Sequence, residues 1–569
     1  MKVGAVTTYR NNILVWYYRQ NTEASPLFIA FLCKIDDNAG NRIHMLSANK
    51  PRTTEKQVPR FRSVGFSGPQ IAALSILLTL LISIPIWTHP LPPLSDYVNH
   101  LARMQVIATI SQNARLANFY EIDWRVIPNL TMDLIVPLLA HVMKIYLAGQ
   151  VFMVAMFVLI ISGTLALNRA LIGRWSAVPL FVIPLLYNYV FLVGVMNYIS
   201  GIGVALWALA GWIVTRERAW PMRFALSTAS VVVLFFCHLA ALGIYGVGVL
   251  SFEIVRLWQR RREPWPSRLV DFVASGAPFL IAAPLLYASP TMQLVGDIDW
   301  EQGGKLDGLM YVFSDYSDIV AFGLMGVMTG SIVWAMRHRV LRFHPLVFAL
   351  IVVGGVVYFA LPRVIFDTYM ADQRVPLGIA FMLIACGDLD LRRRLVRRAF
   401  VAVLILLVGS RVLEIDLNWS QLSDSTSQFR SSVRRISPGS KVFVAYADRS
   451  QGDDVRDLGL VHAACIAIIE RSALVTTAFT VVGKQIMHVR PQYRDFVDRY
   501  DGTPPSTAQL IVAAEHPLPD MPRFWLNWTK FDYLYILFTE DEAPNPDPER
   551  LKLVVDGDRF QLYRIIKRP

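Results

Sequence analysis

The stretch QVFMVAMFVLIISGTLALN, residues 150–168, decides the fold class of this protein. It carries no charged side chain over a length at which a helix crosses a hydrocarbon core of about 30 Å. Similar apolar tracts recur from about residue 69 to residue 413, and 54% of the whole chain is hydrophobic. One soluble core could not bury so much apolar sequence. The sequence therefore predicts a polytopic α-helical membrane protein.

Twelve segments satisfy the same test of length and apolar content. They lie near residues 70–89, 131–148, 150–168, 177–194, 197–214, 224–237, 239–257, 268–288, 316–336, 345–361, 373–387 and 398–413. Positive charge concentrates in the short cytoplasmic loops of membrane proteins. We therefore expect four basic loops on the cytoplasmic side, at residues 216–223, 256–268, 337–342 and 392–398, and the acidic loop 289–315 outside.

The number of crossings follows from where the two ends belong. A basic N-terminal stretch is typical of the cytoplasmic side, whereas the loop charges place the C-terminal part outside. Opposite sides require an odd number of crossings. We therefore expect eleven spans, and we expect the segment that does not cross among the four between residues 131 and 214.

The net charge of +12 does not indicate a nucleic-acid partner. Residues 414–569 carry 19 Lys and Arg against 21 Asp and Glu, so the positive excess belongs to the N-terminus and the membrane loops. We expect residues 1–68 to be a basic cytoplasmic extension, partly disordered. Residues 69–413 then form the transmembrane domain, with a long outer loop over 90–130, and residues 414–569 form a soluble domain on the outer side.

The soluble domain has the pattern of an α/β fold. Alternating or apolar runs bounded by turn residues predict strands at 441–446, 510–514, 533–538 and 560–566, and the spacing at 462–471 predicts a helix. No glycine-rich phosphate loop follows any of these strands. The four cysteines are scattered and show neither a disulfide framework nor a metal-binding spacing.

The long outer loop holds the most informative polar residues. Ser95 can cap a helix in which Asp96, His100 and Arg103 share one face, at i, i+4 and i+7. Apolar residues cover the rest of this helix, so we expect it to lie along the membrane surface. The polar row is either part of a functional site or only the solvated face of an interfacial helix. Glu121 and Asp123 follow later in the loop.

This layout resembles the GT-C type membrane glycosyltransferases, which include oligosaccharyltransferases, protein mannosyltransferases and lipid A aminoarabinose transferases. The resemblance lies in the basic start, the long first outer loop with an acid in PPLSDYVNHLAR, about eleven spans and an outer α/β domain. It implies that Asp96 is a general base or a metal ligand, with a divalent cation as an open question. The tandem acid of the family is absent, since Tyr97 follows Asp96, so a partner acid would come from Glu121 or Asp123.

Such chemistry needs a cation for the departing polyprenyl phosphate and a carboxylate for the acceptor hydroxyl. Arg363 and Arg374 lie at the expected outer membrane edge, where charged groups are costly and usually functional. For Arg374 the alternatives are phosphate binding, a structural pair with Asp367 or Asp372, and snorkelling.

Two histidines complete the candidate site. His238 lies at an outer turn and either binds substrate or caps a helix, and His100 either orients Asp96 or contacts the phosphate.

The resulting hypothesis is a transferase in the bilayer of a bacterial inner (plasma) membrane. It would move a sugar from a polyprenyl-phosphate donor to an acceptor glycan, lipid or protein on the outer face. Two alternatives stay open. One is a transporter or flippase, which would show ionisable or broken helices in mid-membrane and paired repeats. The other is a non-catalytic component of cell-envelope polysaccharide assembly.

Overall fold

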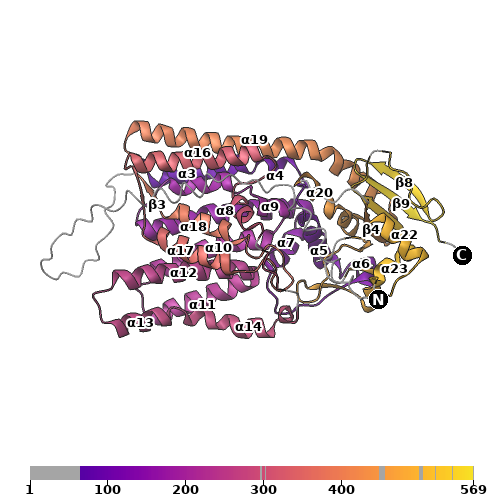
Figure 1. The fold of residues 1–569 in the computed structure, drawn as a ribbon, viewed down its shortest axis with the longest axis horizontal. Helices are drawn as coiled ribbons and strands as arrows, with labels where there is room; N and C mark the ends of the chain where they lie inside the picture. Colours follow the sequence, from indigo (N-terminus) through magenta and orange to yellow (C-terminus); the bar gives the residue numbers. More distant parts are fainter. Residues whose placement is uncertain are drawn as a thin grey trace, which may run out of the picture. The chain divides into compact units, whose positions relative to one another are not determined.

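The computed structural model describes residues 65–294, 298–301, 303–447, 455–498, 504–519, 521–540 and 542–567. Residues 1–64, most of the expected N-terminal extension, lie outside the described residues. Within the described part the chain is mostly helical, with a mixed sheet near the C-terminus (Figure 1).

Six helical segments in the described part are long and apolar enough to cross a membrane. They are α8 (Ile145–Ile172), α10 (Met196–Val214), α11 (Trp220–Cys237), α12 (Leu239–Gln259), the run from α13 to α14 (Trp265–Ala288) and α16 (Asp318–Arg337). Shorter apolar helices are α3 (Gly68–Ile82), α7 (Thr131–Ala140), α17 (Leu346–Ala360) and α18 (Val375–Ala385). A multi-span membrane protein is thus confirmed, while the total of eleven crossings and the orientation stay predictions.

Apolar side chains on several helices face outward rather than into the protein. Ile319 on α16 is 85% exposed, Phe348 on α17 is 70% exposed and Ile405 is 60% exposed. Soluble monomers rarely expose apolar surface on this scale, whereas lipid tails accept it without cost. These faces are therefore the lipid-facing sides of the bundle.

Four of the expected single spans are not single helices: 70–89 divides between α3 and α4 (Ile84–Thr88), and 268–288 lies in the interrupted run from α13 to α14. The other two have longer breaks. In 131–148, α7 ends at Ala140 and the next helix begins only at Ile145. In 177–194, the chain forms a 3-10 helix, η2 (Val178–Leu185), and then a short helix, α9 (Tyr189–Val193). Pro179 and Pro184 explain the second case, since proline lacks the N–H that an α-helix needs and its ring clashes with the preceding turn.

A long helix, α19 (Arg394–Val433), joins the apolar part of the chain to the C-terminal part. It passes the expected boundary at residue 414 without a break. Arg411 is fully buried in the middle of α19, where it pairs with Asp315 and donates a 2.7 Å hydrogen bond to the Phe313 carbonyl. Near its end, Phe429 packs into the core of the sheet. One rigid element therefore takes part in both halves of the fold.

The C-terminal sheet has the strand order β5-β4-β7-β9-β8. Its strands are β4 (Lys441–Tyr446), β5 (Leu474–Val475), β7 (Tyr533–Leu537), β8 (Leu551–Gly557) and β9 (Phe560–Ile565). β4 runs parallel to β5 and β7, whereas β9 runs antiparallel to β7 and β8, so the sheet is mixed. The strands expected at 441–446, 533–538 and 560–566 are confirmed, and the helix expected at 462–471 forms over its second half as α21 (Ile466–Arg471).

The strand expected at 510–514 is wrong. This segment belongs to a helix, α22 (Thr507–Glu515). Ser506 caps it, and the side chains of Ser506 and Gln509 bond each other's backbone N–H groups in a capping box. Those two bonds favour a helix start and outweigh the strand preference of a short apolar run.

The helix expected on the membrane surface is buried instead. α5 (Tyr97–Thr109) packs one side into the core of the membrane helices and another into the core of the C-terminal sheet. The first group is Tyr97, Leu101 and Met104, and the second is Val98, Ala102 and Val106. α5 therefore lies between the two cores, and its polar row is not a solvated face.

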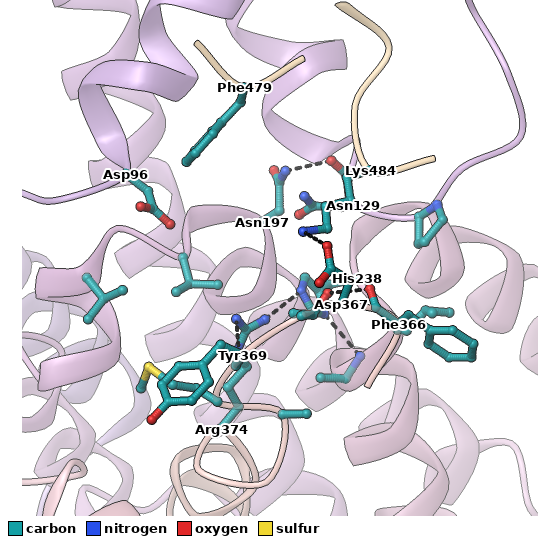
Figure 2. A pocket seen from close by; sticks show the side chains of 18 of the residues that line it. Asp96, Asn129, Asn197, His238, Phe366, Asp367, Tyr369, Arg374, Phe479 and Lys484 are labelled. Atoms are coloured by element: carbon teal, nitrogen blue, oxygen red, sulfur yellow. Dashed lines mark hydrogen bonds and ion pairs between the residues drawn. The ribbon is translucent and has the colours of Figure 1, made fainter. Parts of the chain in front are cut away.

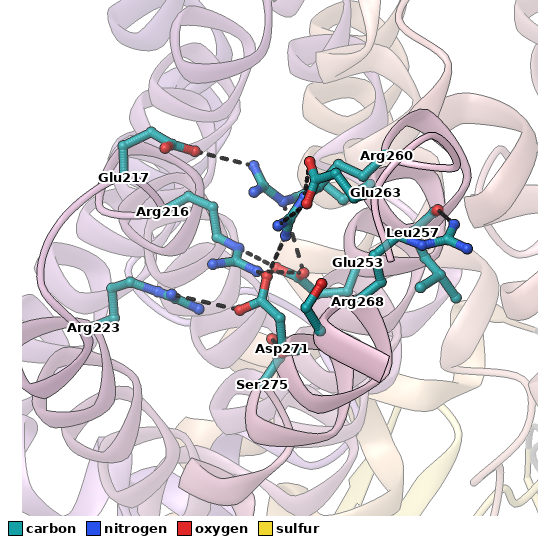
Figure 3. Close-up of polar contacts among 12 residues, drawn as sticks. Arg216, Glu217, Arg223, Glu253, Leu257, Arg260, Glu263, Arg268, Asp271 and Ser275 are labelled. Carbon is teal, nitrogen blue, oxygen red and sulfur yellow. Dashed lines mark hydrogen bonds and ion pairs between the residues drawn. The ribbon is translucent and has the colours of Figure 1, made fainter. Parts of the chain in front are cut away.

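Much of the basic charge in two of the expected cytoplasmic loops is neutralised within the protein (Figure 3). Arg216, just after α10, donates hydrogen bonds of 2.9 and 3.1 Å to Glu253 of α12 and also pairs with Asp271 of α13. Arg260 reaches the same Asp271 at 2.6 Å. Paired charges of this kind hold the ends of α10, α12 and α13 together.

Candidate functional site

A cavity of about 660 Å³ lies where the helices meet the C-terminal domain. This volume is in the range of sites for small molecules. Asp96 contributes from the start of α5, His238 from the junction of α11 and α12, and Arg374 from the start of α18 (Figure 2). Residues of the C-terminal domain, among them His462 and Lys484, line the same cavity. The two sequence-predicted groups of opposite charge, Asp96 and Arg374, are thus brought to one space.

The backbone holds Asp96 in place. Its N–H donates a 2.9 Å hydrogen bond to the carbonyl of Val193, at the end of α9. Gly194 follows with a φ of +91°, and a Cβ there would lie 2.9 Å from the Asp96 nitrogen. Only glycine suits both the conformation and the close approach. The Asp96 side chain makes no capping bond to α5 and keeps 30% of its surface exposed, so the carboxylate is available to a ligand.

A histidine of the C-terminal domain approaches this carboxylate. Nε2 of His462 lies 3.5 Å from Oδ1 of Asp96, at the outer limit of hydrogen bonding. Burial by itself would raise the pKa of Asp96, but the contact with His462 and the electrostatic influence of His462, His100 and Arg374 lower it below its ordinary value. Asp96 is therefore ionised at neutral pH.

His100 lies one turn after Asp96 and also lines the cavity. Burial lowers the pKa of His100 to about 3, and the nearby charge of Arg103 acts in the same direction. The ring packs edge-on against Phe479, with 5.4 Å between centroids. Its Nδ1 is buried and has no hydrogen-bond partner in the described part of the chain. His100 is thus a neutral imidazole with one buried nitrogen that lacks a hydrogen-bond partner among the described residues.

Arg374 pairs with neither of the acids proposed as its structural partners. Asp367 contacts Lys484 at 2.8 Å, and Asp372 is taken by other basic residues. Arg374 donates a 3.0 Å hydrogen bond to the carbonyl of Tyr369, and its Nε is buried without a partner among the described residues. No carboxylate of the described residues forms an ion pair with it. A buried guanidinium in this state is costly unless an anion joins it.

His238 and Arg374 present hydrogen-bond donors to the same point. Nδ1 of His238 accepts a 3.0 Å hydrogen bond from the N–H of Ala240, so a neutral ring carries its proton on Nε2. That Nε2 lies 2.9 Å from NH1 of Arg374, which can only donate. Two donors at this distance are satisfied together when an acceptor lies beside both. The pair therefore suits an anionic oxygen, such as that of a phosphate.

The cavity also has an apolar wall between two of the apolar helices. Gly243, Ile244 and Val247 line it from α12, and Val357 lines it from α17. A Cβ added at Gly243 would meet no atom within 4 Å, so this part of the helix faces open space. A hydrocarbon chain could lie along this wall.

Arg103 and Arg363, expected at the site, are not among the residues that line the cavity. Arg103 is 1% exposed and forms two hydrogen bonds with Asp133, of 2.7 and 3.0 Å. Arg363 is fully buried and bonds Asp372 at 2.9 Å and Glu301 at 3.1 Å. Both guanidinium groups are thus taken up by internal ion pairs.

Glu121 and Asp123 also lie outside the cavity lining. Glu121 belongs to a short strand, β1 (Tyr120–Ile122), and faces His488 of β6 (Met487–Val489) in the register of that ladder. Asp123 pairs at 2.7 Å with Arg125 on the surface. Neither acid is placed beside Asp96. Within the described residues no group of three or more His, Cys, Asp or Glu side chains is arranged to hold a metal ion.

The sequence interpretation did not single out His462 or Lys484. Both are far from Asp96 along the chain, and neither belongs to a recognisable motif. His462 appeared only as the first residue of an expected helix. Nothing in a single sequence indicates which residue of one domain will meet a loop of the other.

The fold resembles that of ArnT. Two structures of this aminoarabinose transferase from Cupriavidus metallidurans, one bound to undecaprenyl phosphate and one in the apo state, match with a TM-score of 0.46 each. They are 9% and 11% identical to this chain, and the matches cover 88% and 87% of it and 98% of each ArnT chain. No family model and no curated protein matches.

Proposed function

We propose that this protein is a membrane glycosyltransferase. It moves a sugar from a polyprenyl-phosphate donor to an acceptor on the outer face of the membrane. The observation that carries this proposal is that Asp96 and Arg374 line the same cavity. Asp96 is an ionised carboxylate, and Arg374 is a buried guanidinium without a carboxylate partner in the described chain. A transferase for such donors needs one group for the acceptor proton and another for the phosphate.

In the proposed reaction the acceptor hydroxyl oxygen attacks the anomeric carbon of the sugar. Asp96 takes the hydroxyl proton as the new C–O bond forms. The bond from the anomeric carbon to the phosphate oxygen breaks, and the polyprenyl phosphate leaves with the electron pair. Because the acceptor attacks from the opposite face, the configuration of the anomeric carbon is inverted. Arg374 and His238 donate hydrogen bonds to the departing phosphate.

The apolar wall supports a lipid-linked rather than a soluble donor. A phosphate held at Arg374 and His238 would have the apolar side chains of α12 and α17 beside it. A prenyl chain along that wall gains roughly 0.8 kcal/mol for each CH₂ group that leaves water. A soluble sugar nucleotide has no group that would use this surface.

The deciding experiment is the substitution Asp96→Asn, which keeps the size of the side chain and removes the base. We expect loss of the cell's surface glycan product, down to the level of a deletion strain, with a normal amount of protein in the membrane. Asp123→Asn is the matched control, because Asp123 is a surface acid outside the cavity. An unchanged product in Asp96→Asn would overturn the proposal in favour of a transporter or a non-catalytic assembly component.

A further inference from the structure

We infer that His462 is a positioning residue for Asp96: it donates from Nε2 to the carboxylate and holds it turned toward the acceptor. This inference rests on the proposed function, because it assigns His462 a part in the reaction that Asp96 would perform. The C-terminal domain would then supply the residue that positions the proposed base.

The tautomer of His462 is fixed by Asn99, three residues after Asp96 on α5. The Asn99 Oδ1 accepts a 2.9 Å hydrogen bond from the N–H of Phe479, so its amide nitrogen must be on the other side. That nitrogen donates a 2.7 Å bond to the carbonyl of Thr477 and lies 3.2 Å from Nδ1 of His462. Since the amide nitrogen only donates, Nδ1 must accept, and the ring proton is on Nε2, which faces Asp96.

The position of the ring is also fixed by packing. Phe479 lies edge-on against His462 with 4.8 Å between centroids, and the His462 side chain is 15% exposed. Asn99 is fully buried, so the residue that fixes the His462 tautomer is sheltered from bulk water, while Asp96 at the other end of the row keeps 30% of its surface exposed to the cavity. A histidine oriented by an amide on one nitrogen and facing a carboxylate with the other is arranged to orient that carboxylate.

The titratable and charged groups around Asp96 are His462, His100 and Arg374. His100 is the alternative candidate for this role, since it lies one turn along α5. It differs in that no residue of the described chain bonds its Nδ1, so its tautomer is not fixed. Arg374 bonds the Tyr369 carbonyl instead of the carboxylate. His462 is thus the one of the three whose proton is directed at Asp96 by a further contact.

Three variants of one residue separate positioning from packing. In His462→Asn the amide can keep the contact with Asn99 but does not reach Asp96, in His462→Gln the longer amide can still donate to Asp96, and in His462→Leu both contacts are lost. Spheroplasts pulsed with radiolabelled glucose at a series of medium pH values report the rate of label entry into surface glycan. We expect a fall of about tenfold to a hundredfold for Asn and Leu, the size typical of a misplaced reacting group, and most of the rate for Gln.

The pH profile gives a second readout that a purely structural role would not change. Without His462 a contact that lowers the pKa of Asp96 is gone while burial, which raises it, remains. The acid limb of the rate profile should therefore move to higher pH in His462→Asn and stay near that of the wild type in His462→Gln. A wild-type rate and profile in His462→Asn would overturn the inference, and so would an equal loss in Gln and Leu with an unmoved limb.

The Asp96→Asn strain shows whether a negative result concerns only the role of His462 or the proposed function as a whole. If Asp96→Asn abolishes the product and His462→Asn does not change its rate or profile, only the role of His462 is wrong. If Asp96→Asn leaves the product unchanged, the transferase itself is wrong.

Discussion

At the scale of single residues, the buried arginines differ in whether a carboxylate of the protein pairs with them. Arg103 and Arg363 are buried in ion pairs with Asp133 and Asp372. Arg374 is also buried, but within the described chain it donates to a carbonyl and lies against a histidine nitrogen that is itself a donor. An internal pair neutralises the charge of a guanidinium. The buried charge of Arg374 has no carboxylate partner in the described chain, and a bound anion can neutralise it.

Substitution of Arg374 should therefore affect turnover. We expect Arg374→Gln to lower the rate of glycan formation by about a hundredfold, since a charge-assisted contact to the leaving phosphate is lost. Arg374→Lys should retain part of the rate, because it keeps the charge without the planar fork. The matched control is Arg125→Gln, which removes a surface arginine outside the cavity. Equal rates in Arg374→Gln and the wild type would contradict phosphate binding by this residue.

Substitution of a residue in one of the internal ion pairs should instead affect the stability of the fold. Asp133→Ala leaves Arg103 buried without its carboxylate, which costs about 3 to 5 kcal/mol of unfolding free energy for a buried pair. We expect a clearly lower unfolding temperature in detergent, measured by the fluorescence of tryptophan on heating. An unfolding temperature equal to that of the wild type would mean that the pair contributes nothing to the fold.

At the scale of elements, α12 is arranged to give the cavity an apolar wall. Gly243 and Val247 are one turn apart, and both face the cavity. The missing side chain at Gly243 leaves room that no neighbouring atom fills. Glycine costs a helix about 1 kcal/mol relative to alanine. Among the described glycines where an added Cβ would meet no atom within 4 Å, Gly243 is the one that lines the cavity.

Filling this space should block a prenyl chain. We expect Gly243→Phe to abolish glycan formation or lower it strongly, with the protein still present in the membrane. Gly243→Ala is the control, because a Cβ there meets no atom within 4 Å and alanine favours the helix. Binding of a fluorescent polyprenyl phosphate to purified protein should fall in Gly243→Phe and not in Gly243→Ala. If Gly243→Phe retained binding, the prenyl chain would have to lie somewhere other than along this wall.

At the scale of the whole molecule, the two halves are joined through α19 and α5. α19 continues from the apolar region into the core of the sheet, and α5 packs against both cores. The expected side of the membrane for the C-terminal domain then fixes the side of the cavity, since His462 and Lys484 line it.

Cysteine labelling of intact cells tests that side. In a Cys33→Ser background the three remaining cysteines are buried. We expect Ser427→Cys, at an exposed position near the end of α19, to react with a membrane-impermeant maleimide added outside. Arg262→Cys, exposed in the loop between α12 and α13, should react only after the cells are opened. The reverse pattern would place the cavity on the cytoplasmic side.

The sequence by itself determined that this protein is embedded in lipid, and it determined much of the local structure. Apolar runs such as 150–168 require lipid whatever their neighbours are, because the free energy of burying them depends on their own composition and length. The strand at 441–446 followed from its own pattern in the same way. Asp96 stood out because an acid just past the first apolar segment resembles the arrangement in a known superfamily.

Only the tertiary structure decided which charged residues share a cavity. Arg363 and Arg374 are close in sequence. Arg363 is nevertheless enclosed by acids, whereas Arg374 faces the cavity. Likewise α5 has an apolar pattern that suits a membrane surface equally well, and it became a buried helix because the C-terminal domain covers it. Its neighbours across the fold are brought close by packing between distant segments, and a pattern confined to one segment carries no information about them.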